Sequence, residues 1–419
     1  MVNPPSVTVT GMGLVLPTGT GLSAAEPVFA GRSAVAYLNG TTRLAGVTGA
    51  SASGFVAPEG TAAHDRAVQM AAAAADDAWR GARLHEKPAS PDRVAVLVSL
   101  SKGGIFALTR WARDTAAAPG ATGRQATAAE PHHADGPQWA DPAAAGRLLA
   151  QRYRLAGPVL SPVTACASGG HALTWAASLI RRRVVDAALV GAAEASLHPL
   201  VLGSYRRMGV LAEARTDPTT SVRPFSATRR GFAVGEGAGV LVLEAADSAA
   251  RRGVRPLVRL TGWATGSHGA GMTDVEVGGA ALAHLMRSAL DRAGTPPGSI
   301  DYVHAHGTAT RANDLAEARA IRAALGSAAD TVSVSSTKAS HGHLLGAATA
   351  VETVVTVLAM GRSLVPPTVN LTDPDPAIGL DCTPMRARDR PIRTAMKIAG
   401  GFGGQMVAFV LSQAMGDGA

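Results

Sequence analysis

The sequence predicts an α/β protein made of two comparable halves. Short apolar runs typical of buried strands, such as residues 94–100, alternate along the chain with longer segments of helical apolar spacing, such as residues 344–360. The order of these elements restarts near residue 250, which indicates an internal duplication. We therefore expect one half over residues 1–250 and a second half over residues 251–419.

The first half begins with a strand, at residues 7–10, that is expected to enter a glycine turn at residues 11–13. The alanine-rich segment 64–83 predicts a helix. Residues 114–145, rich in Ala, Pro, Gly and His, predict a long loop or a loose helix. Buried strands are expected at three further places: residues 94–100, 184–192 and 239–244.

The second half repeats the alternation of strands and helices. Strands are expected at residues 256–260, 300–305, 331–335, 397–399 and 406–411. Helices are expected at residues 278–293, 315–325 and 344–360. Side chains at strand ends converge on functional sites in α/β folds, so the histidines that follow the strand at 300–305 are candidates for function.

Cys166 stands between a short apolar segment and residues 172–180, whose apolar spacing is helical. It would therefore lie at a helix N-terminus, where unpaired N–H groups and the helix dipole stabilise a thiolate. The neighbours that would let a substrate come close are all small: Ala165, Ala167, Ser168 and Gly169. This environment suits a nucleophile. The alternative is a packed core cysteine, because free cysteine is usually buried and inert.

Two histidine motifs follow predicted strands in the second half, at residues 304–310 and 338–343. Each has two histidines separated by one small residue, and a glycine that lets backbone or ligand approach. A His-x-His spacing without further ligands is a weak zinc signal, so we expect no metal. Lys338 and Glu352 could form an ion pair that holds the second loop. Together with Cys166, the two motifs favour a thiol active site.

The charge balance argues against nucleic acid as the partner. The chain has 39 Lys and Arg against 31 Asp and Glu, a formal charge of +8. The arginines occur in pairs and triplets rather than in one basic tract with interleaved aromatic residues. Two interpretations remain open: a solvated surface, or a docking surface for an acidic protein.

The cysteines and the N-terminus indicate a cytoplasmic protein. Cys166 and Cys382 are too few for a disulfide framework or a metal-ligand set, which fits a reducing compartment. Residues 1–6 lack the basic and apolar regions of a signal peptide, and no run of about 18 apolar residues is present. We therefore expect no membrane association.

The ordered motifs resemble the thiolase-like condensing enzymes, specifically the β-ketoacyl-acyl-carrier-protein synthases. The similarity extends to synthase II and to the ketosynthase subunit of type II polyketide synthases. The separations of 140 residues from Cys166 to His306 and of 37 residues from His306 to His343 are close to those of the family. The motifs that carry the resemblance span nearly the whole chain: 9–13, 164–169, 223–225, 231–239, 305–310, 342–347 and 401–404.

The resemblance implies a five-layered αβαβα fold with two duplicated halves, the first carrying the nucleophile and the second the histidines. Cys166 would accept the acyl group, and His306 and His343 would be the catalytic pair. The remaining implied roles fall into three groups. They are an oxyanion hole from the backbone N–H groups of Cys166 and Phe402, a supporting ion pair of Lys338 and Glu352, and contacts to the phosphopantetheine arm from Thr308, Thr310 and, as a further candidate, Thr273.

The implied reaction is a decarboxylative Claisen condensation in polyketide or fatty-acid biosynthesis. An acyl group held on Cys166 would react with malonyl-acyl carrier protein to give a β-ketoacyl-acyl carrier protein. Two alternatives remain open: a non-decarboxylating acyltransferase and a chain-length-factor-like partner subunit. Such subunits lose the cysteine, so Cys166 argues against the second, and His343 argues against the first because other branches commonly replace one histidine.

The resemblance also implies the partners. Acyl carrier proteins are small and acidic, so Arg206 and Arg207, in a segment that borders the pocket entrance in the family, are candidates for the docking site. No resident cofactor is expected, because the carrier protein brings the phosphopantetheine arm. Members of the family are dimers, so we expect a homodimer or a heterodimer with a chain-length-factor subunit.

Several residues depart from the family pattern. His304 stands where Glu or Asn is common, and His341 is a second unusual histidine, two residues before His343. Each is either an ordinary loop residue or a change in proton handling near the site. Ser226 replaces a frequent Asp, and Gly400 replaces a bulky residue before the glycine turn.

Overall fold

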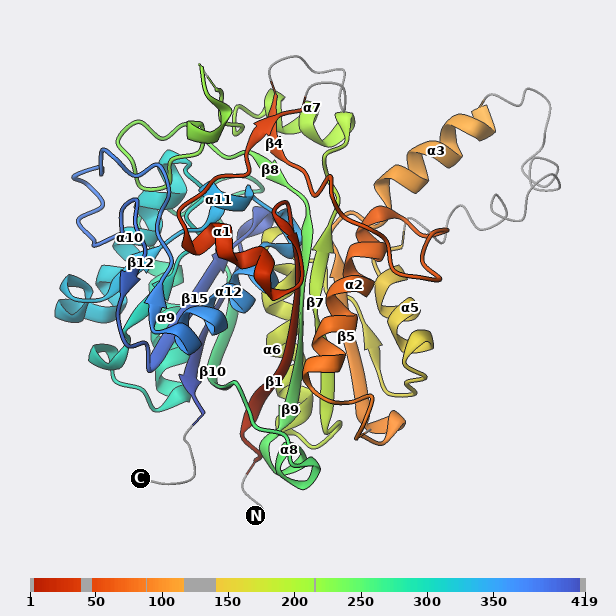
Figure 1. Cartoon of the computed structure of the whole chain (residues 1–419). Coiled ribbons are helices and arrows are strands. Elements are labelled where there is room, and N and C mark those ends of the chain that lie inside the picture. Colours follow the sequence, from red (N-terminus) through yellow and green to blue (C-terminus); the bar gives the residue numbers. More distant parts are fainter. Residues whose placement is uncertain (1–3, 39–46, 88, 117–140, 215, 415–419) are drawn as a thin grey trace.

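The computed structural model describes residues 4–38, 47–87, 89–116, 141–214 and 216–414, and Figure 1 shows their arrangement. The loop or loose helix predicted at 114–145 lies mostly outside these residues. Of its two ends, residues 114–116 belong to helix α3 and residues 144–145 begin helix α5.

The elements of the first half follow one another as predicted, with alternating strands and helices. Its strands are β1 Val7–Leu16, β2 Gly19–Thr20, β3 Ala36–Tyr37, β4 Thr48–Ala50, β5 Val94–Leu100, β6 Val159–Leu160, β7 Ala187–Glu194, β8 Val234–Gly235 and β9 Gly237–Ala245. Its helices are α1 Glu26–Phe29, α2 Arg66–Gly81, α3 Ile105–Ala116, α5 Ala144–Arg152, α6 Ser168–Arg181, α7 Pro199–Arg207 and α8 Ala246–Arg252.

The second half has the same alternation. Its strands are β10 Val258–Ser267, β11 Tyr302–His304, β12 Ser333–Ser335, β13 Leu364–Val365, β14 Arg388–Asp389, β15 Thr394–Gly400 and β16 Gln405–Gln413. Its helices are α9 Ala280–Ala293, α10 Arg311–Leu325, α11 Lys338–His341 and α12 Ala348–Arg362.

The strand order of the large sheet confirms the duplication. It runs β12-β11-β15-β16-β10-β1-β9-β7-β5-β6, and an antiparallel pairing of β1 with β10 joins the two halves. In the first half β1 pairs antiparallel with β9, β9 antiparallel with β7, β7 parallel with β5, and β5 parallel with β6. The second half repeats this pattern: β10 pairs antiparallel with β16, β16 antiparallel with β15, β15 parallel with β11, and β11 parallel with β12. The boundary near residue 250 stays a prediction.

Glycines at matching places let a helix lie close on the first strand of each half. A shift in strand register comes just before Gly11 in β1 and just before Gly262 in β10. A Cβ at Gly11 would clash with the backbone of Ala78 in α2, and one at Gly262 with that of Ala289 in α9. The turn predicted at 11–13 is therefore wrong: β1 continues through these glycines, which serve helix packing instead.

The layers are those of an αβαβα fold (Figure 1). Helices α2 and α5 cover the outer face of the first half-sheet, α9 and α10 cover that of the second, and α6 and α12 lie between the halves. Small residues bring the two central helices together, because a Cβ at Gly169 of α6 would be 2.8 Å from the Cβ of Ala350 in α12. Gly169 thus serves helix packing rather than the substrate approach expected from the sequence.

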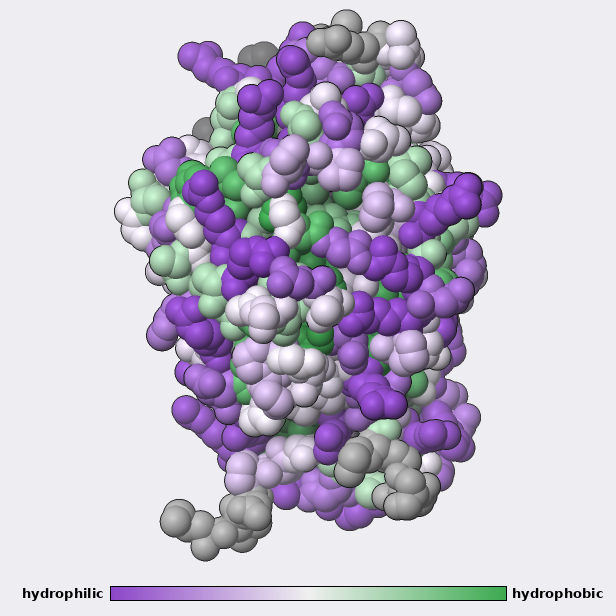
Figure 2. Space-filling model, turned by 90° about the vertical axis from the view of Figure 1, so that its left-hand side faces the viewer, coloured by the Kyte–Doolittle hydropathy of each residue, from purple (hydrophilic) through white to green (hydrophobic). Residues whose placement is uncertain are grey.

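Helix α12 and the turn before it are unusually apolar. Within the described residues, Leu345–Arg362 is the one helical stretch with the length and composition of a membrane span, and 83% of it is buried inside the fold. That burial is what a central core helix requires. The face of the second half, in contrast, is mostly hydrophilic, with apolar residues showing between polar ones in its upper part (Figure 2).

A matched pair of turns precedes the two central helices. The turn Ala165–Ala167 leads into α6, and the turn Leu345–Ala347 leads into α12. Each begins with a non-glycine residue in the left-handed region, Ala165 at φ 49° and Leu345 at φ 47°. The duplication therefore extends to the local backbone at the start of both helices.

Candidate active site

Cys166 lies in the turn before α6, as the sequence predicted, and is 8% exposed. The Ser168 hydroxyl holds the turn: it accepts from the Thr164 N–H at 2.9 Å and donates to the Ala165 carbonyl at 2.7 Å. From α12, the Thr349 hydroxyl donates to the Cys166 carbonyl at 3.0 Å. The sulfur is thus held between two helix starts.

The expected stabilisation of a thiolate does not dominate the electrostatics of Cys166. Burial raises the pKa of its thiol to about 11, and the nearby cations Lys102 and Lys338 offset only part of this effect. Cys166 therefore rests as a neutral thiol near pH 7. It needs a base to take its proton when the sulfur attacks.

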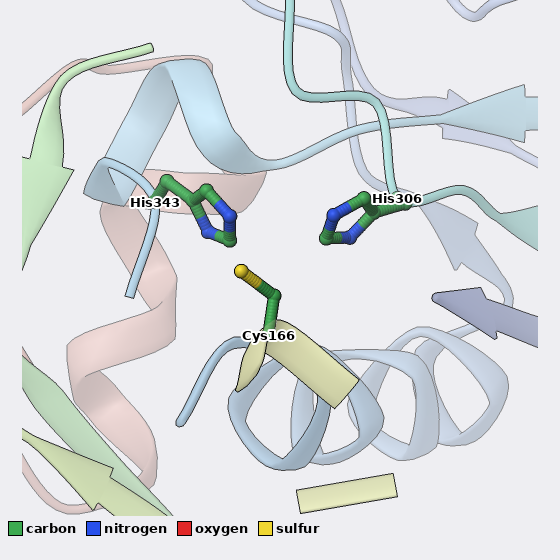
Figure 3. A group of neighbouring side chains, drawn as sticks. All are labelled: Cys166, His306 and His343. Carbon is green, nitrogen blue, oxygen red and sulfur yellow. The ribbon is translucent and has the colours of Figure 1, made fainter. Parts of the chain in front are cut away.

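Two imidazole rings face the sulfur. Sγ of Cys166 and ring nitrogens of His306 and His343 all lie within 4.8 Å of one another. The two rings meet edge to face, with centroids 5.3 Å apart, and the sulfur points into the gap between them (Figure 3). The structure therefore brings together the three residues that the sequence singled out.

The backbone of His306 is fixed on both sides by buried charges. Its N–H donates to Glu317 Oε1 at 2.5 Å, and the N–H of Gly307 donates to Glu317 Oε2 at 2.6 Å. Its carbonyl accepts from Lys338 Nζ. Gly307 adopts φ 47°, and a Cβ there would be 2.7 Å from Ser336 Oγ, so glycine is required after His306.

A backbone donor sets the tautomer of His343. Its Nδ1 accepts from the Leu345 N–H at 3.2 Å, so the neutral ring carries its proton on Nε2. Phe232 packs edge to face on this ring, with centroids 4.9 Å apart. Among the described residues, Nδ1 of His306 has no hydrogen-bond partner, so the protein leaves the tautomer of that ring free.

His306 and His343 are both neutral near pH 7. Burial lowers the pKa of His306 and of His343 well below the ordinary value, and the Lys338 cation lowers both further. A neutral imidazole can donate a hydrogen bond through one nitrogen and accept a proton at the other. The pair therefore has the protonation state required of hydrogen-bond donors and of a base for the Cys166 thiol.

The predicted ion pair of Lys338 and Glu352 is present and fully buried, and the sequence analysis missed its third member. Lys397 Nζ lies 2.7 Å from Glu352 Oε2, while Lys338 Nζ pairs with Oε1. Burial alone would raise the pKa of Glu352, but the two lysines hold it well below its usual range. The only sequence signal for Lys397 was a lysine inside an apolar strand.

Glu317 was missed as well. It lies on α10, is 2% exposed, and binds the backbone after β11 through both carboxylate oxygens. The Asn313 amide, one helical turn earlier, donates to Glu317 Oε2 at 2.7 Å. An Asn and a Glu at this spacing are common on exposed helix faces, so the pattern alone carried no signal.

A cavity of about 230 Å³ opens onto the side chains of Cys166, His306 and His343. Among its lining residues are those predicted to contact the phosphopantetheine arm or the oxyanion: Thr273, Thr308, Thr310 and Phe402. The hydroxyls of Thr308 and Thr310 are 2.9 Å apart. Gly400 also lines the cavity, and no atom of the described residues lies within 4 Å of a Cβ built there, so among them a larger residue would have room.

Arg206 and Arg207 are exposed at the end of α7, close to this cavity. The preceding residue, Tyr205, packs against two cavity-lining rings, with centroids 5.8 Å from Phe232 and 6.3 Å from Phe402. Both arginines follow Tyr205 at the end of the same helix, and their part in docking a carrier protein stays a prediction.

The donor set of the site also has the residue types that bind soft cations, one thiol and two imidazoles. That the reaction uses no metal stays an expectation from the sequence.

The comparisons with known proteins agree with this geometry. The family profile described as "Beta-ketoacyl synthase, N-terminal domain" matches residues 5–249, and the one described as "Beta-ketoacyl synthase, C-terminal domain" matches residues 257–372. A putative polyketide beta-ketoacyl synthase 1 of Streptomyces cyaneus is 33% identical over 433 residues, covering 97% of each chain. The 3-oxoacyl-acyl-carrier-protein synthase 2 of Coxiella burnetii is 38% identical and covers 64% of this chain and 65% of its own.

Solved structures are similar over the whole chain. A complex of a type II PKS acyl-carrier protein with its ketosynthase (AntDE:AntF) matches with a TM-score of 0.88 and 30% identity, covering 98% of this chain and 100% of the other. The ishigamide ketosynthase/chain length factor matches with a TM-score of 0.86 and 28% identity, at the same coverage.

Proposed function

The chain belongs to the beta-ketoacyl synthase family and is a condensing enzyme of the acyltransferase type, and from this premise we propose how its own residues perform the reaction. One observation carries the proposal: a neutral thiol and two neutral imidazoles meet within 4.8 Å at a cavity. The reaction is the decarboxylative condensation of an acyl group on Cys166 with malonyl-acyl carrier protein, in polyketide or fatty-acid biosynthesis.

In the first step Cys166 takes the acyl group. Its sulfur attacks the carbonyl carbon of an acyl thioester while a neighbouring imidazole accepts the thiol proton. The tetrahedral oxyanion is stabilised by the backbone N–H groups of Cys166 and Phe402. The bond to the carrier's thiol then breaks, and the imidazole returns the proton to that leaving group.

In the second step malonyl-acyl carrier protein enters. His306 and His343 donate hydrogen bonds to its thioester oxygen, which stabilises the enolate that forms as the C–C bond to the carboxylate breaks and CO₂ leaves. The enolate carbon attacks the acyl carbon on Cys166, the bond from that carbon to the sulfur breaks, and the released thiolate takes one proton from solvent. Each charge-stabilising donor of this kind contributes about 3 kcal/mol, so loss of either histidine is severe.

The partners follow from the same site. Arg206 and Arg207 offer positive charge beside the cavity to an acidic acyl carrier protein, whose phosphopantetheine arm passes Thr273, Thr308 and Thr310. The arm is brought by the carrier, and we propose that the enzyme holds no cofactor of its own.

A second subunit is proposed on the sheet edge. Strand β6 ends the large sheet, and its side chains Val159 and Leu160 are 36% and 38% exposed. Val163, just beyond, is 47% exposed. An exposed apolar sheet edge suits contact with another chain, and we propose a second copy or a chain-length-factor subunit there.

Since Cys166 and Cys382 are both free thiols, we propose that the protein lies in the cytoplasm.

The test is intact-mass spectrometry of the purified protein with acyl-loaded carrier protein, followed by malonyl-loaded carrier protein. We expect acyl mass on Cys166, then CO₂ release and a β-ketoacyl product; Cys166→Ala removes the acyl mass. Acylation without CO₂ release, also after addition of a chain-length-factor subunit, would identify a plain acyltransferase. No acylation at all would contradict the proposal.

A further inference from the structure

The two histidines that depart from the family pattern are both fully buried next to catalytic-site residues. His304 ends β11, two residues before His306, and His341 ends α11, two residues before His343. Each is 0% exposed, and neither ring lines the substrate cavity. They are therefore part of the frame around the site rather than of its surface.

A single hydroxyl joins the two rings. Thr337 Oγ1 lies 3.1 Å from His304 Nε2 and 2.8 Å from His341 Nε2. Thr337 stands at the position before α11, but its side chain makes no capping hydrogen bond to that helix. Its hydroxyl is used by the two imidazoles instead.

The chain of hydrogen bonds continues to a backbone carbonyl at each end. His341 Nδ1 lies 2.8 Å from the carbonyl oxygen of Gly342. At the other end, His304 Nδ1 lies 2.9 Å from the Thr356 hydroxyl, which donates to the Glu352 carbonyl at 2.7 Å. Because carbonyl oxygens only accept, the positions of the hydrogens in this chain can be counted.

Two neutral imidazoles and two hydroxyls supply four hydrogens for these five contacts. His341 must donate from Nδ1 to Gly342, so Thr337 donates to its Nε2. A His304 proton on Nε2 then gives both Thr337 contacts a hydrogen and leaves the shortfall at Thr356, between His304 Nδ1 and the Glu352 carbonyl; a proton on Nδ1 would leave it between His304 and Thr337. A link between the two rings through Thr337 therefore requires the Nε2–H tautomer of His304. Neutral rings agree with burial, which lowers the pKa of His304 well below its usual range and that of His341 to about 4.

The chain acts on the backbone of both catalytic-site loops. His341 fixes the carbonyl of the Gly342–His343 peptide, where Gly342 has φ 74° and packs against Gly235. At the other end, the His304 carbonyl accepts from Lys397 Nζ at 3.2 Å. Its ring is thus tied to one loop while its backbone leads directly to His306.

We propose that His304, Thr337 and His341 form a clamp of positioning residues that holds the His306 loop and the His343 loop at the spacing the enolate step requires. The clamp is uncharged and lies beside the Lys338–Glu352–Lys397 cluster, which anchors the same two loops by ion pairs. The inference rests on the proposed function, because it assigns the two loops to the decarboxylation step.

The clamp predicts an unequal effect on the two half-reactions. Acylation needs only one imidazole, as the base for the Cys166 thiol, together with the N–H groups around the sulfur. CO₂ release needs both imidazoles on one oxygen, so a small displacement of either ring is costly. Thr337→Val removes the shared hydroxyl at nearly constant volume. We expect it to lower CO₂ release from malonyl-carrier protein about tenfold or more, while Cys166 acylation stays within about twofold.

Two further variants separate positioning from general destabilisation. Thr337→Ser keeps the hydroxyl and should restore CO₂ release to within about threefold of the unmodified protein. Thr8→Val is the control: it removes a comparably buried hydroxyl of β1, which donates to the Glu244 carbonyl at 3.0 Å, and it should change neither half-reaction. Equal losses of acylation and CO₂ release in Thr337→Val, or no loss in either, would overturn the clamp.

A second readout does not need activity. In the protein with ¹⁵N-labelled histidine, NMR should show the Nδ1–H tautomer for His341 and the Nε2–H tautomer for His304. Thr337→Val should shift the ring signals of His306 and His343, and Thr8→Val should leave them in place. If the unmodified protein releases no CO₂, the proposed function is wrong, but the NMR signals still test whether Thr337 positions the two rings. If Thr337→Val leaves the ring signals of His306 and His343 in place, the clamp is wrong.

Discussion

Gly401 lies against the backbone of Cys166: a Cβ on Gly401 would be 3.0 Å from the Cys166 nitrogen and 2.9 Å from the Thr164 carbonyl oxygen. Gly401 has φ −146° and ψ 160°, an extended conformation that any residue adopts, so its small size matters only for this approach. The loop that carries Phe402 is therefore packed directly on the turn that carries Cys166.

Gly401→Ala should displace the Phe402 N–H from the position where the oxyanion forms. We expect acylation of Cys166 to fall about 10²-fold, the usual loss on removing one oxyanion donor, with little change in melting temperature. Gly361→Ala is the control, because a Cβ there has nothing within 4 Å. Normal acylation in Gly401→Ala would remove Phe402 from the oxyanion hole.

Glu317→Gln should loosen the His306 loop. The new amide would set an NH₂ group against one of the two backbone N–H groups that the carboxylate now accepts from, at a cost of about 1–3 kcal/mol in the free energy of unfolding. CO₂ release should fall more than acylation. Urea unfolding and both half-reactions check this, with the exposed Glu59→Gln as the control; unchanged stability would show that the loop needs no carboxylate.

Alkylation of Cys166 should rise steadily with pH. Its thiol has a pKa of about 11, so the reactive thiolate fraction grows about tenfold per pH unit above neutrality. Iodoacetamide labelling, followed by mass spectrometry in a Cys382→Ala background, measures the midpoint. A midpoint below pH 8 would mean that the helix N-terminus outweighs burial after all.

Acid should destabilise the protein partly through His341. Burial lowers the pKa of this ring to about 4, so the unfolded chain, with a pKa near 6.5, binds the proton more readily. Above about pH 6.5 His341 is unprotonated in both the folded and the unfolded chain, and the free energy of unfolding is unaffected by this ring. As the pH falls from 6.5 towards 4, the unfolded chain alone takes up the proton, and the free energy of unfolding decreases. Between pH 7 and pH 4.5, His341→Gln should lose about 2 kcal/mol less unfolding free energy than the unmodified protein; equal losses in urea titrations would contradict the assignment.

Reversal of the charges on α7 should weaken carrier-protein binding. Arg206→Glu with Arg207→Glu replaces two positive charges beside the cavity by negative ones, so the Kd for acyl carrier protein should rise, most strongly at low salt. Arg182→Glu with Arg255→Glu, at two exposed positions, is the control, because it changes the net charge by the same amount. Equal Kd values for both variants would locate the docking surface elsewhere.

The sequence could identify the residues that lie in recognisable local motifs. These are Cys166 before a predicted helix, and His306 and His343 after predicted strands; each lies in a short segment whose glycines and small residues indicate a turn or a close approach. Glu317 and Lys397 could not be found in this way. Their roles come from the partners that the sheet and α10 bring to them, and neither residue has a neighbour in sequence that reveals those partners.

Tertiary packing also reversed two local interpretations. Gly11 was expected to turn the chain, yet β1 continues through it. A glycine is needed there because the backbone of α2 occupies the space that a side chain would take. The Cys166 helix start was expected to lower the thiol pKa, yet burial raises it. In both cases the outcome depends on packing against elements that are distant in sequence, and a short sequence pattern does not contain that information.

The matching turns at the starts of α6 and α12 differ in one residue that matters for the site. The duplication sets Gly346 in the place that Cys166 holds in the first half, each one residue after a left-handed residue. A Cβ at Gly346 would be 2.5 Å from the Ser101 side chain and 3.0 Å from Glu194 Oε2, so the second turn has no room for a nucleophile. Of the two matching turns, the first therefore carries a thiol, and the second has no space for a side chain at the matching position.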